Sequence, residues 1–237
     1  PYLLKKHRSG ARLGHDTAYD HMFLDGLEDA YEPGRAMGTF AQDTANAYQM
    51  TREEMDAYTI ESLARANAAI ASGAFADEVV PVTVSTRAGD VVVEHDEAPG
   101  KGRPDKIPQL KPAFAKDGTI TAATSSSISD GAAALVLTRA SVAEAKGLAP
   151  VARIVATAAH AQAPAEFTTA PIPAIQKVLD RAGWSVEDVD LFEVNEAFAC
   201  VAMFAMRDLG IPHEKINVNG SGTALGHPIG ASGARII

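Results

Sequence analysis

The segment VDLFEVNEAFACVAMFAMRDLG, residues 189–210, joins two apolar runs across a polar break at Asn195 and Glu196. The first run, residues 189–194, has the composition of a buried strand, and residues 197–209 have that of a helix. A strand that passes directly into a helix is typical of an α/β fold. Because open α/β sheets usually bind ligands at the carboxyl ends of their strands, Asn195 and Glu196 occupy a candidate ligand-binding position.

The same alternation of strand and helix extends outward from this segment over everything after Ser125. Four apolar runs have the composition of strands: residues 133–137, 151–159, 189–194 and 216–219. Helices are predicted between and after them: residues 141–146, 174–182, 197–209 and from about 231. This rhythm predicts a mostly parallel sheet covered by helices on both faces.

Residues 1–124 lack that rhythm and are predicted to form an inserted, loop-rich subdomain. The sequence TREE at Thr51 has the pattern of a capping box, which predicts a helix that ends at Gly73. Two β-rich runs follow around residues 87–90 and predict a hairpin, and Pro81 confines the first run to an entry or edge position. The proline-rich stretch 98–114 predicts an irregular loop.

Composition bounds the function. The chain has 237 residues and a net charge of −9 at pH 7, which argues against a nucleic-acid backbone as the main partner. Its apolar runs are too short to span a membrane, and its start resembles no export signal. A lone cysteine, Cys200, excludes an internal disulfide and fits a reducing compartment, so we expect a cytoplasmic protein. The absence of a methionine at Pro1 suggests processing or an excerpt.

The glycine-rich stretch VNGSGTALGHPIGASGARII, residues 218–237, is the second candidate site. Gly226 permits unusual backbone geometry and Pro228 disfavours a helical His227, so a stiff turn presents this histidine. Gly230 precedes a predicted helix start whose free amides favour an anion. Leu225 breaks the dinucleotide-binding glycine pattern, so a nucleotide cofactor is disfavoured.

Each of these features also has a purely structural interpretation. Asn195 can be the N-cap of the helix that follows it, and His227 can be a hydrogen-bonded histidine beside a glycine hinge. SSSISDG, residues 125–131, can be a polar turn. Cys200 lies in an apolar helix and is expected to be buried rather than reactive. The histidines show no ligand-like spacing, so no metal is predicted.

Taken together, five motifs closely resemble the thiolase family, most of all its bacterial acetyl-CoA acetyltransferases. They are VNEAFA, NVNGSGTALGHPIGASGAR, SDGAAALVL, LKPAF and AMGTFAQDTA. The resemblance implies a layered α-β-α-β-α fold with an inserted loop domain that embraces coenzyme A. Residues 1–124 then resemble that loop domain, 125–150 the end of the N-terminal half, and 151–237 the C-terminal half without its last segment.

The resemblance also implies roles for individual residues. His227 resembles the histidine that activates a nucleophilic cysteine and helps to form an oxyanion hole, and Asn195 the asparagine that positions a water there. Ser126, Met37 and Phe114 resemble residues that line the channel for the pantetheine arm of coenzyme A.

Two glycines of the same loop, Gly226 and Gly230, are expected to support the oxyanion-binding turn. Ala36 stands where the best-known members have histidine. Both family cysteines belong to segments outside residues 1–237, so this chain alone is expected to be inactive.

The implied activity is reversible Claisen condensation: acyl-CoA and acetyl-CoA give 3-oxoacyl-CoA and CoA through an acyl-cysteine. No cofactor is needed, because the coenzyme A thioesters are themselves the substrates. The implied assembly is a homotetramer or dimer, without nucleic acid, membrane or metal. Two alternatives stay open: a non-catalytic, coenzyme-A-binding scaffold, and a related ketoacyl-synthase-type condensing enzyme.

Overall fold

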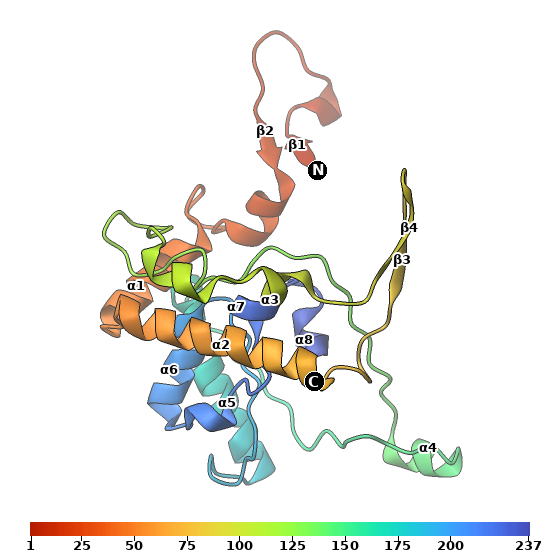
Figure 1. The fold of residues 1–237 in the computed structure, drawn as a ribbon. Coiled ribbons are helices and arrows are strands. Elements are labelled where there is room, and N and C mark those ends of the chain that lie inside the picture. Colours follow the sequence, from red (N-terminus) through yellow and green to blue (C-terminus); the bar gives the residue numbers. More distant parts are fainter.

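The computed structural model describes residues 1–237 and shows a helical body from which two hairpins and one short helix project (Figure 1). The body is built from helices that share buried faces: α1 (Met37–Ala47), α2 (Arg52–Ser72), α5 (Pro171–Ala182), α6 (Ala199–Leu209) and α7 (Gly222–Leu225). The remaining helices are short: α3 (Glu97–Lys101), α4 (Ala140–Ala145) and α8 (Ser232–Arg235). Short 3-10 helices of three to six residues lie along the chain, and one π-helix, Phe23–Leu27, precedes α1.

The helix predicted at Thr51 is confirmed as α2, together with its capping box. The Thr51 hydroxyl accepts from the Glu54 amide at 3.2 Å, and the Glu54 carboxylate accepts from the Thr51 amide at 2.8 Å. Gly73 ends the helix with φ of 76°. Local signals therefore set both ends of the longest helix in the chain.

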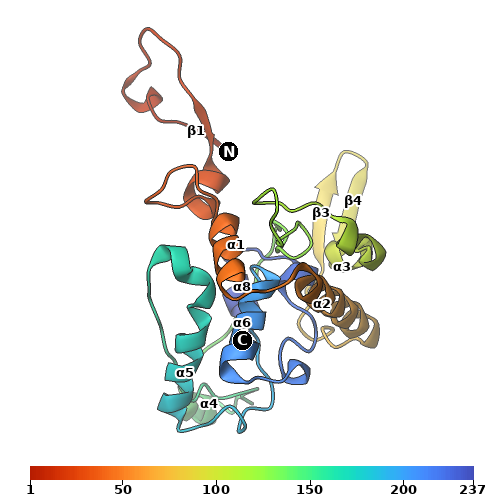
Figure 2. The same cartoon turned by 90° about the vertical axis from the view of Figure 1, so that its left-hand side faces the viewer.

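The core surrounds α6, which lies between α5 and α2 in the view of Figure 2. Its buried residues face the other helices of the body, and Phe204 is fully buried. Met55 of α2, Ala41 and Ala45 of α1, and Ile216 complete the same cluster. Burial of each large apolar side chain contributes about 1.5–3 kcal/mol, so this cluster holds the body together.

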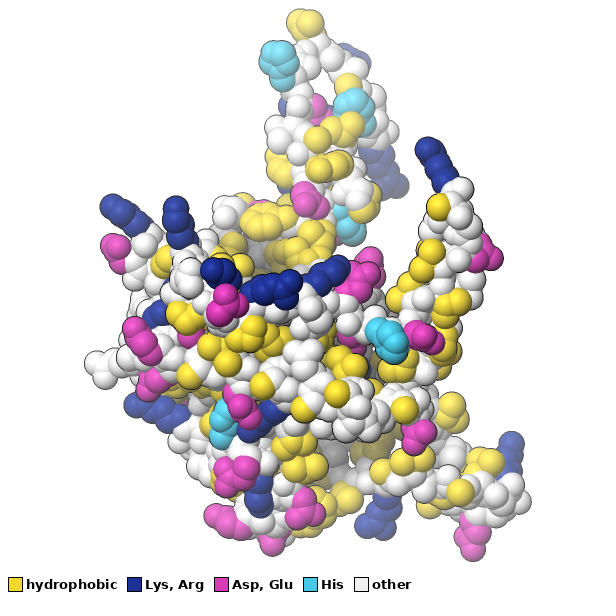
Figure 3. Space-filling model, in the orientation of Figure 1, with side chains coloured by type: hydrophobic (Ala, Val, Ile, Leu, Met, Phe, Trp, Pro, Cys, Tyr) yellow, Lys and Arg dark blue, Asp and Glu magenta, His cyan; other side chains and the backbone are white.

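Both hairpins are antiparallel and stand away from the body. β3 (Val82–Thr86) pairs with β4 (Gly89–Val93) directly after Pro81, which confirms the predicted hairpin. β1 (Tyr2–Leu4) pairs with β2 (Ala18–Asp20) at the N-terminus. The valines of β3 and β4 stay 43–58% exposed and form the apolar surface along that arm in Figure 3.

The predicted parallel sheet does not form, and this prediction was wrong. Residues 133–137 and 151–159 run extended without a ladder, and residues 189–194 and 216–219 share only one parallel bridge, between Phe192 and Ile216. A strand needs a hydrogen-bonded neighbour, and within residues 1–237 the first two segments have none. Val136 and Val151 are accordingly almost completely exposed, at 98% and 104%.

The predicted helices fare better than the strands. α4, α5 and α8 lie where residues 141–146, 174–182 and 231 onward were predicted, although α5 starts earlier, at Pro171. α6 starts at Ala199 rather than at residue 197. The stretch predicted to be irregular, residues 98–114, instead contains most of α3 and a 3-10 helix, Pro104–Gln109.

Candidate functional site

Asn195 and His227, 32 residues apart in the sequence, lie in contact. The Asn195 Nδ2 atom is 3.3 Å from His227 Nε2 and 3.5 Å from His227 Nδ1. Asn195 follows the Phe192–Ile216 bridge, and His227 occupies the loop between α7 and α8. Two separate loops thus bring a carboxamide and an imidazole to one point, and both side chains are half-buried.

The serine run joins these two loops. Ser125 bridges to Phe198, and the Ser126 amide donates to the Ala197 carbonyl at 3.0 Å. The Ser127 carbonyl of the same run accepts a hydrogen bond from the His227 amide at 3.2 Å. This segment is therefore more than the polar turn of the structural interpretation, because it connects the asparagine loop to the histidine loop.

Gly226 holds a backbone position that favours glycine. Its φ is +89°, and an added Cβ would lie 2.2 Å from Ser129 Oγ and 3.2 Å from Ser127 Oγ. Any side chain would be strained at this φ and would require Ser129 to move. Gly230 is different: it is exposed, an added Cβ would meet nothing within 4 Å, and nothing in the structure explains the glycine there.

Asn195 is not a helix cap, so the structural interpretation of this residue was wrong. α6 begins at Ala199, and its N-cap is Phe198, which makes no side-chain cap. The reason is the pairing of residues 197–199 with the serine segment, which keeps the chain extended past Asn195. The Oδ1 atom of Asn195 is buried and has no hydrogen-bond partner. An unpaired buried acceptor of this kind costs about 1–3 kcal/mol, and a ligand or water that donates to it would remove that cost.

The His227 ring is held from its other side by Ser232, a residue that sequence reasoning missed. Ser232 Oγ lies 2.6 Å from Nδ1 of the ring, and the residue Ser232 is 3% exposed. Burial, with a smaller effect from the Arg235 charge, lowers the pKa of His227 below its ordinary value. The imidazole is therefore neutral at pH 7 and can accept a proton.

Glu196 is fully buried, and the sequence singled it out only by its position. Its carboxylate accepts five hydrogen bonds at 2.6–3.2 Å, from Tyr58 Oη, Ser62 Oγ, Asn217 Nδ2, Thr223 N and Thr223 Oγ1. These donors come from α2, from the residue after Ile216, and from α7. The buried carboxylate therefore fastens the glycine loop to α2 directly beside Asn195.

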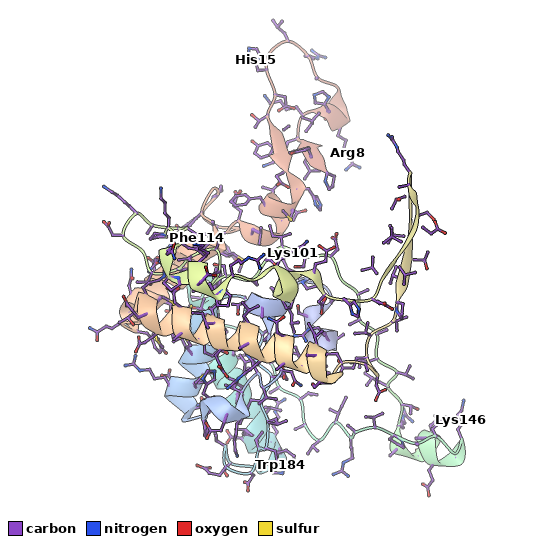
Figure 4. All side chains as sticks on the ribbon, viewed as in Figure 1. Arg8, His15, Lys101, Phe114, Lys146 and Trp184 are labelled. Carbon is purple, nitrogen blue, oxygen red and sulfur yellow. The ribbon has the colours of Figure 1, made fainter.

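Phe114 packs against the start of α1, next to Met37 in the sequence. Met37 is the first residue of α1, and the next residue, Gly38, touches the Phe114 ring so closely that an added Cβ would lie 2.2 Å from it. Phe114, labelled in Figure 4, meets Phe198 edge to face with ring centroids 6.0 Å apart. Phe198 is three residues from Asn195, so Phe114 lies beside the segment that carries the asparagine.

The lone cysteine and the metal-ligating side chain types form no second site. Cys200 is buried, and burial raises its thiol pKa to about 12, so it is not a thiolate at neutral pH. No three histidine, cysteine or acidic side chains gather to hold a metal ion. None of the helices is long and apolar enough to cross a membrane.

One hollow of the body lies away from the candidate site. It has a volume of about 930 Å³ and lies between α2 and α6, lined by Tyr58, Met203, Met206 and His213 among others. A second, apolar hollow of about 320 Å³ lies between residues 153–156 and α5, beside Trp184, which Figure 4 labels. Asn195 and His227 line neither hollow.

Comparisons with known proteins agree on one family. A model of the thiolase N-terminal domain matches residues 1–141, and one of the C-terminal domain matches residues 148–237. A probable acetyl-CoA acetyltransferase from Dictyostelium discoideum is 48% identical over 238 residues, which cover 100% of this chain and 57% of that protein.

Two crystal structures are similar along the whole chain. They are an acetyl-CoA acetyltransferase from Bacillus anthracis, with TM-score 0.94 and 44% identity, and a thiolase from Ascaris suum in complex with coenzyme A, with TM-score 0.92 and 41% identity. Each match covers 100% of this chain and 60% of that chain. The predicted thiolase-like fold is thereby confirmed as a partial one, although its parallel sheet is reduced to one hydrogen-bonded bridge within residues 1–237.

The chain belongs to the thiolase family. It spans about 60% of the length of the relatives that it matches. The two family models meet between residues 141 and 148. The finer division at residues 124 and 150 stays a prediction, as do the roles of the site residues.

Proposed function

We propose that residues 1–237 carry the oxyanion-stabilising half of a thiolase site, which acts on acyl-CoA and coenzyme A in reversible Claisen condensation. The observation that carries this proposal is the 3.3 Å approach of Asn195 Nδ2 to His227 Nε2 across two loops. The names of the relatives, acetyl-CoA acetyltransferases, support acetyl-CoA as one substrate.

The chemistry proceeds in two half-reactions through a cysteine thiol. Neutral His227 takes the thiol proton, the sulfur attacks the thioester carbonyl, and coenzyme A leaves as its thiol, giving an acyl-cysteine. A second base then removes a proton from the methyl carbon of acetyl-CoA, and the resulting enolate carbon attacks the acyl group. The carbon–sulfur bond of the acyl-cysteine breaks, so that 3-oxoacyl-CoA forms and the cysteine leaves as a thiolate that takes up that proton. In both halves the carbonyl oxygen gains negative charge, and one preorganised donor there is worth about 2.7–4 kcal/mol.

The cysteine of this mechanism is not Cys200. Because Cys200 is buried in α6 with its thiol pKa raised to about 12, it supplies no thiolate. We therefore expect residues 1–237 alone to bind coenzyme A thioesters and not to turn them over. Formation of acetyl-CoA from acetoacetyl-CoA and coenzyme A at an enzymatic rate would contradict this expectation.

Binding of coenzyme A tests the proposal directly. Calorimetric titration of the chain with coenzyme A should give saturable binding, and Ser126→Trp, which fills the expected channel, should weaken it at least tenfold. Leu13→Asp is the matched control, since Leu13 is fully exposed on the N-terminal hairpin, and it should leave the affinity unchanged. Absence of binding by a folded chain, or equal affinity in Ser126→Trp, would refute the proposed function.

The oligomeric state, the compartment and the metabolic role are proposed from the family alone. We infer a homo-oligomer, a dimer or tetramer, acting in the cytoplasm in fatty acid metabolism, with no cofactor beyond its thioester substrates. The non-catalytic scaffold is the weaker alternative, because it gives no reason for the unpaired Oδ1 of Asn195 beside His227.

A further inference from the structure

The side chain of Asn217 takes the place of a strand backbone beside Val194. The bridge between Phe192 and Ile216 has two hydrogen bonds. The Phe192 amide donates to Lys215 O at 2.7 Å, and the Asn217 amide donates to Phe192 O at 2.9 Å. A longer parallel ladder would continue with backbone hydrogen bonds to Val194. Instead, Val194 N donates to Asn217 Oδ1 at 2.8 Å, and Asn217 Nδ2 donates to Val194 O at 2.8 Å. Because a carboxamide offers a donor and an acceptor like a peptide group, it extends the bridge by one residue.

The backbone does not continue the ladder because it turns at Asn217. The φ of this residue is +48°, in the left-handed region that asparagine tolerates better than most residues. Its carbonyl accepts from the Gly220 amide at 3.0 Å, in the turn that leads to α7. Asn217 is 1% exposed and Val194 is 6% exposed, so the hydrogen bonds between them are shielded from water.

The surrounding groups fix which way the Asn217 carboxamide points. Its Nδ2 atom also lies 2.9 Å from Glu196 Oε1, so its two N–H groups have two acceptors, the Val194 carbonyl and the Glu196 carboxylate. Tyr58 Oη, 3.2 Å from Nδ2, donates its own proton to Glu196. An exchange of Oδ1 and Nδ2 would put a donor against the Val194 N–H and an acceptor against a carbonyl and a carboxylate. The contacts therefore select the orientation that the structure has.

We infer that Asn217 is a positioning residue for Asn195. Its carboxamide holds the residues on both sides of that asparagine, Val194 and Glu196, and thereby fixes where the Asn195 side chain meets His227. Asn217 itself touches no reacting atom. The inference rests on the proposed function for its meaning, because that function places the chemistry at Asn195 and His227.

A simpler role for Asn217 would be to form the left-handed turn before the glycine loop. Glycine would fill that role equally well, because it adopts a positive φ without strain. The two roles therefore differ in what replacement by glycine does: the positioning role needs the carboxamide, and the turn does not.

Hydrogen exchange followed by NMR tests the inference without any turnover. In the unsubstituted chain, the Val194 amide proton and the side-chain amide protons of Asn217 should exchange slowly with D₂O. The side-chain amide protons of Asn195 should also show a nuclear Overhauser effect to the His227 ring. Fast exchange of the Val194 amide or of the Asn217 side chain in the folded chain would overturn the inference by itself, even if every Asn217 variant failed to fold.

Asn217→Gly separates the carboxamide from the turn. The Val194 amide should exchange about fivefold faster relative to the Phe192 amide of the same sample, which corresponds to about 1 kcal/mol, one ordinary hydrogen bond. Phe192 is the internal reference because its amide donates to Lys215 O and not to the carboxamide. The Overhauser effect between Asn195 and His227 should weaken as well. If both readouts stayed unchanged in Asn217→Gly, Asn217 would only form the turn and the inference would be overturned.

Gln49→Gly is the matched control. Gln49 is the other non-glycine residue with a positive φ, at 54°, and it is exposed after the end of α1. This substitution should change neither readout, and an equal effect there would overturn the inference. Failure of coenzyme A binding by the unsubstituted chain, with slow exchange and the Overhauser effect both present, would refute only the proposed function.

Discussion

Asn195 and Glu196 are neighbours in the sequence with opposite environments. Glu196 is fully buried and accepts five hydrogen bonds, so its carboxylate is satisfied by the protein itself. Asn195 has a buried oxygen with no partner and an amide group that faces His227. Glu196 therefore holds the surrounding loops in place, whereas Asn195 turns its amide group toward His227.

Replacement of Glu196 should destabilise the chain more than replacement of any single donor to it. Glu196→Gln removes the charge and turns an amide N–H₂ toward groups that now donate. A hydrogen bond to a charged group is worth about 1.5–3 kcal/mol, so we expect a loss of at least about 3 kcal/mol in the free energy of unfolding. Urea denaturation followed by circular dichroism measures this loss.

Tyr58→Phe is the matched control for that experiment. It removes one donor to Glu196, at 2.8 Å, and keeps the ring. Because four other hydrogen bonds to the carboxylate remain, the expected loss is about half that of Glu196→Gln or less. Equal losses in the two variants would mean that the carboxylate charge contributes little.

His227 should titrate below the value of about 6.5 that is usual for histidine. Burial is the larger cause of its lowered pKa and the charge of Arg235 the smaller, so Arg235→Gln should raise the pKa without restoring the ordinary value. An NMR titration of the His227 ring measures both values. A His227 pKa above 6.5 in the unsubstituted chain would show that this cationic neighbour and burial do not control the ring.

The lowered pKa of His227 also makes the stability of the chain depend on pH. Because burial also lowers the pKa of His213, both histidines bind a proton more tightly in the unfolded chain than in the folded one. Their contribution to stability is present above about pH 6.5 and is lost as the pH falls through the lower, folded values. The midpoint urea concentration should therefore drop on acidification below pH 6.5, and His213→Gln should reduce the drop.

At the scale of single elements, the loop between α7 and α8 depends on Gly226. Gly226→Ala must place a Cβ 2.2 Å from Ser129 Oγ at a φ of +89°, so we expect a destabilisation of about 1–3 kcal/mol. The ¹⁵N resonances of His227 should shift as well, because the loop moves. Gly230→Ala, four residues on, adds a Cβ in open space and should change neither the melting temperature nor the spectrum.

Elements that depend on local signals could be predicted from the sequence, and those that depend on distant partners could not. α2 and α5 carry their own start and stop residues, and both were predicted within three residues of their observed ends. Residues 133–137 and 151–159 have strand composition, but a strand exists only beside another one. Composition alone does not reveal whether that neighbour is present.

The candidate site likewise has features that local sequence predicts and features that depend on distant residues. The special backbone at Gly226 could be predicted from the sequence, and the family motifs paired Asn195 with His227. The contact of Ser232 with His227 could not, because five residues of spacing in an irregular loop imply no particular geometry. The links from Glu196 to α2, more than 130 residues away, likewise need the folded chain.

At the scale of the whole molecule, the extended segments leave large apolar side chains in water. Val136 and Val151 are 98% and 104% exposed, and Leu137 is 69% exposed, in the segments on either side of α4. Contiguous apolar surface and unpaired strand backbone both promote association between chains. The chain by itself is therefore expected to bind hydrophobic dyes and to aggregate on heating.

Charged residues introduced on either side of α4 should reduce aggregation without lowering the melting temperature. Val136→Glu with Val151→Lys replaces two side chains that bury nothing, so the melting temperature should stay within error while aggregation measured by light scattering falls. Ile216→Lys introduces a charge at a fully buried position and should unfold the body, because an unpaired buried charge costs several kcal/mol. If these two charged substitutions lowered the melting temperature as well, these segments would have to be packed against the body, contrary to their exposure. Unchanged aggregation would place the associating surface elsewhere, with the valines of β3 and β4 as the next candidates to replace.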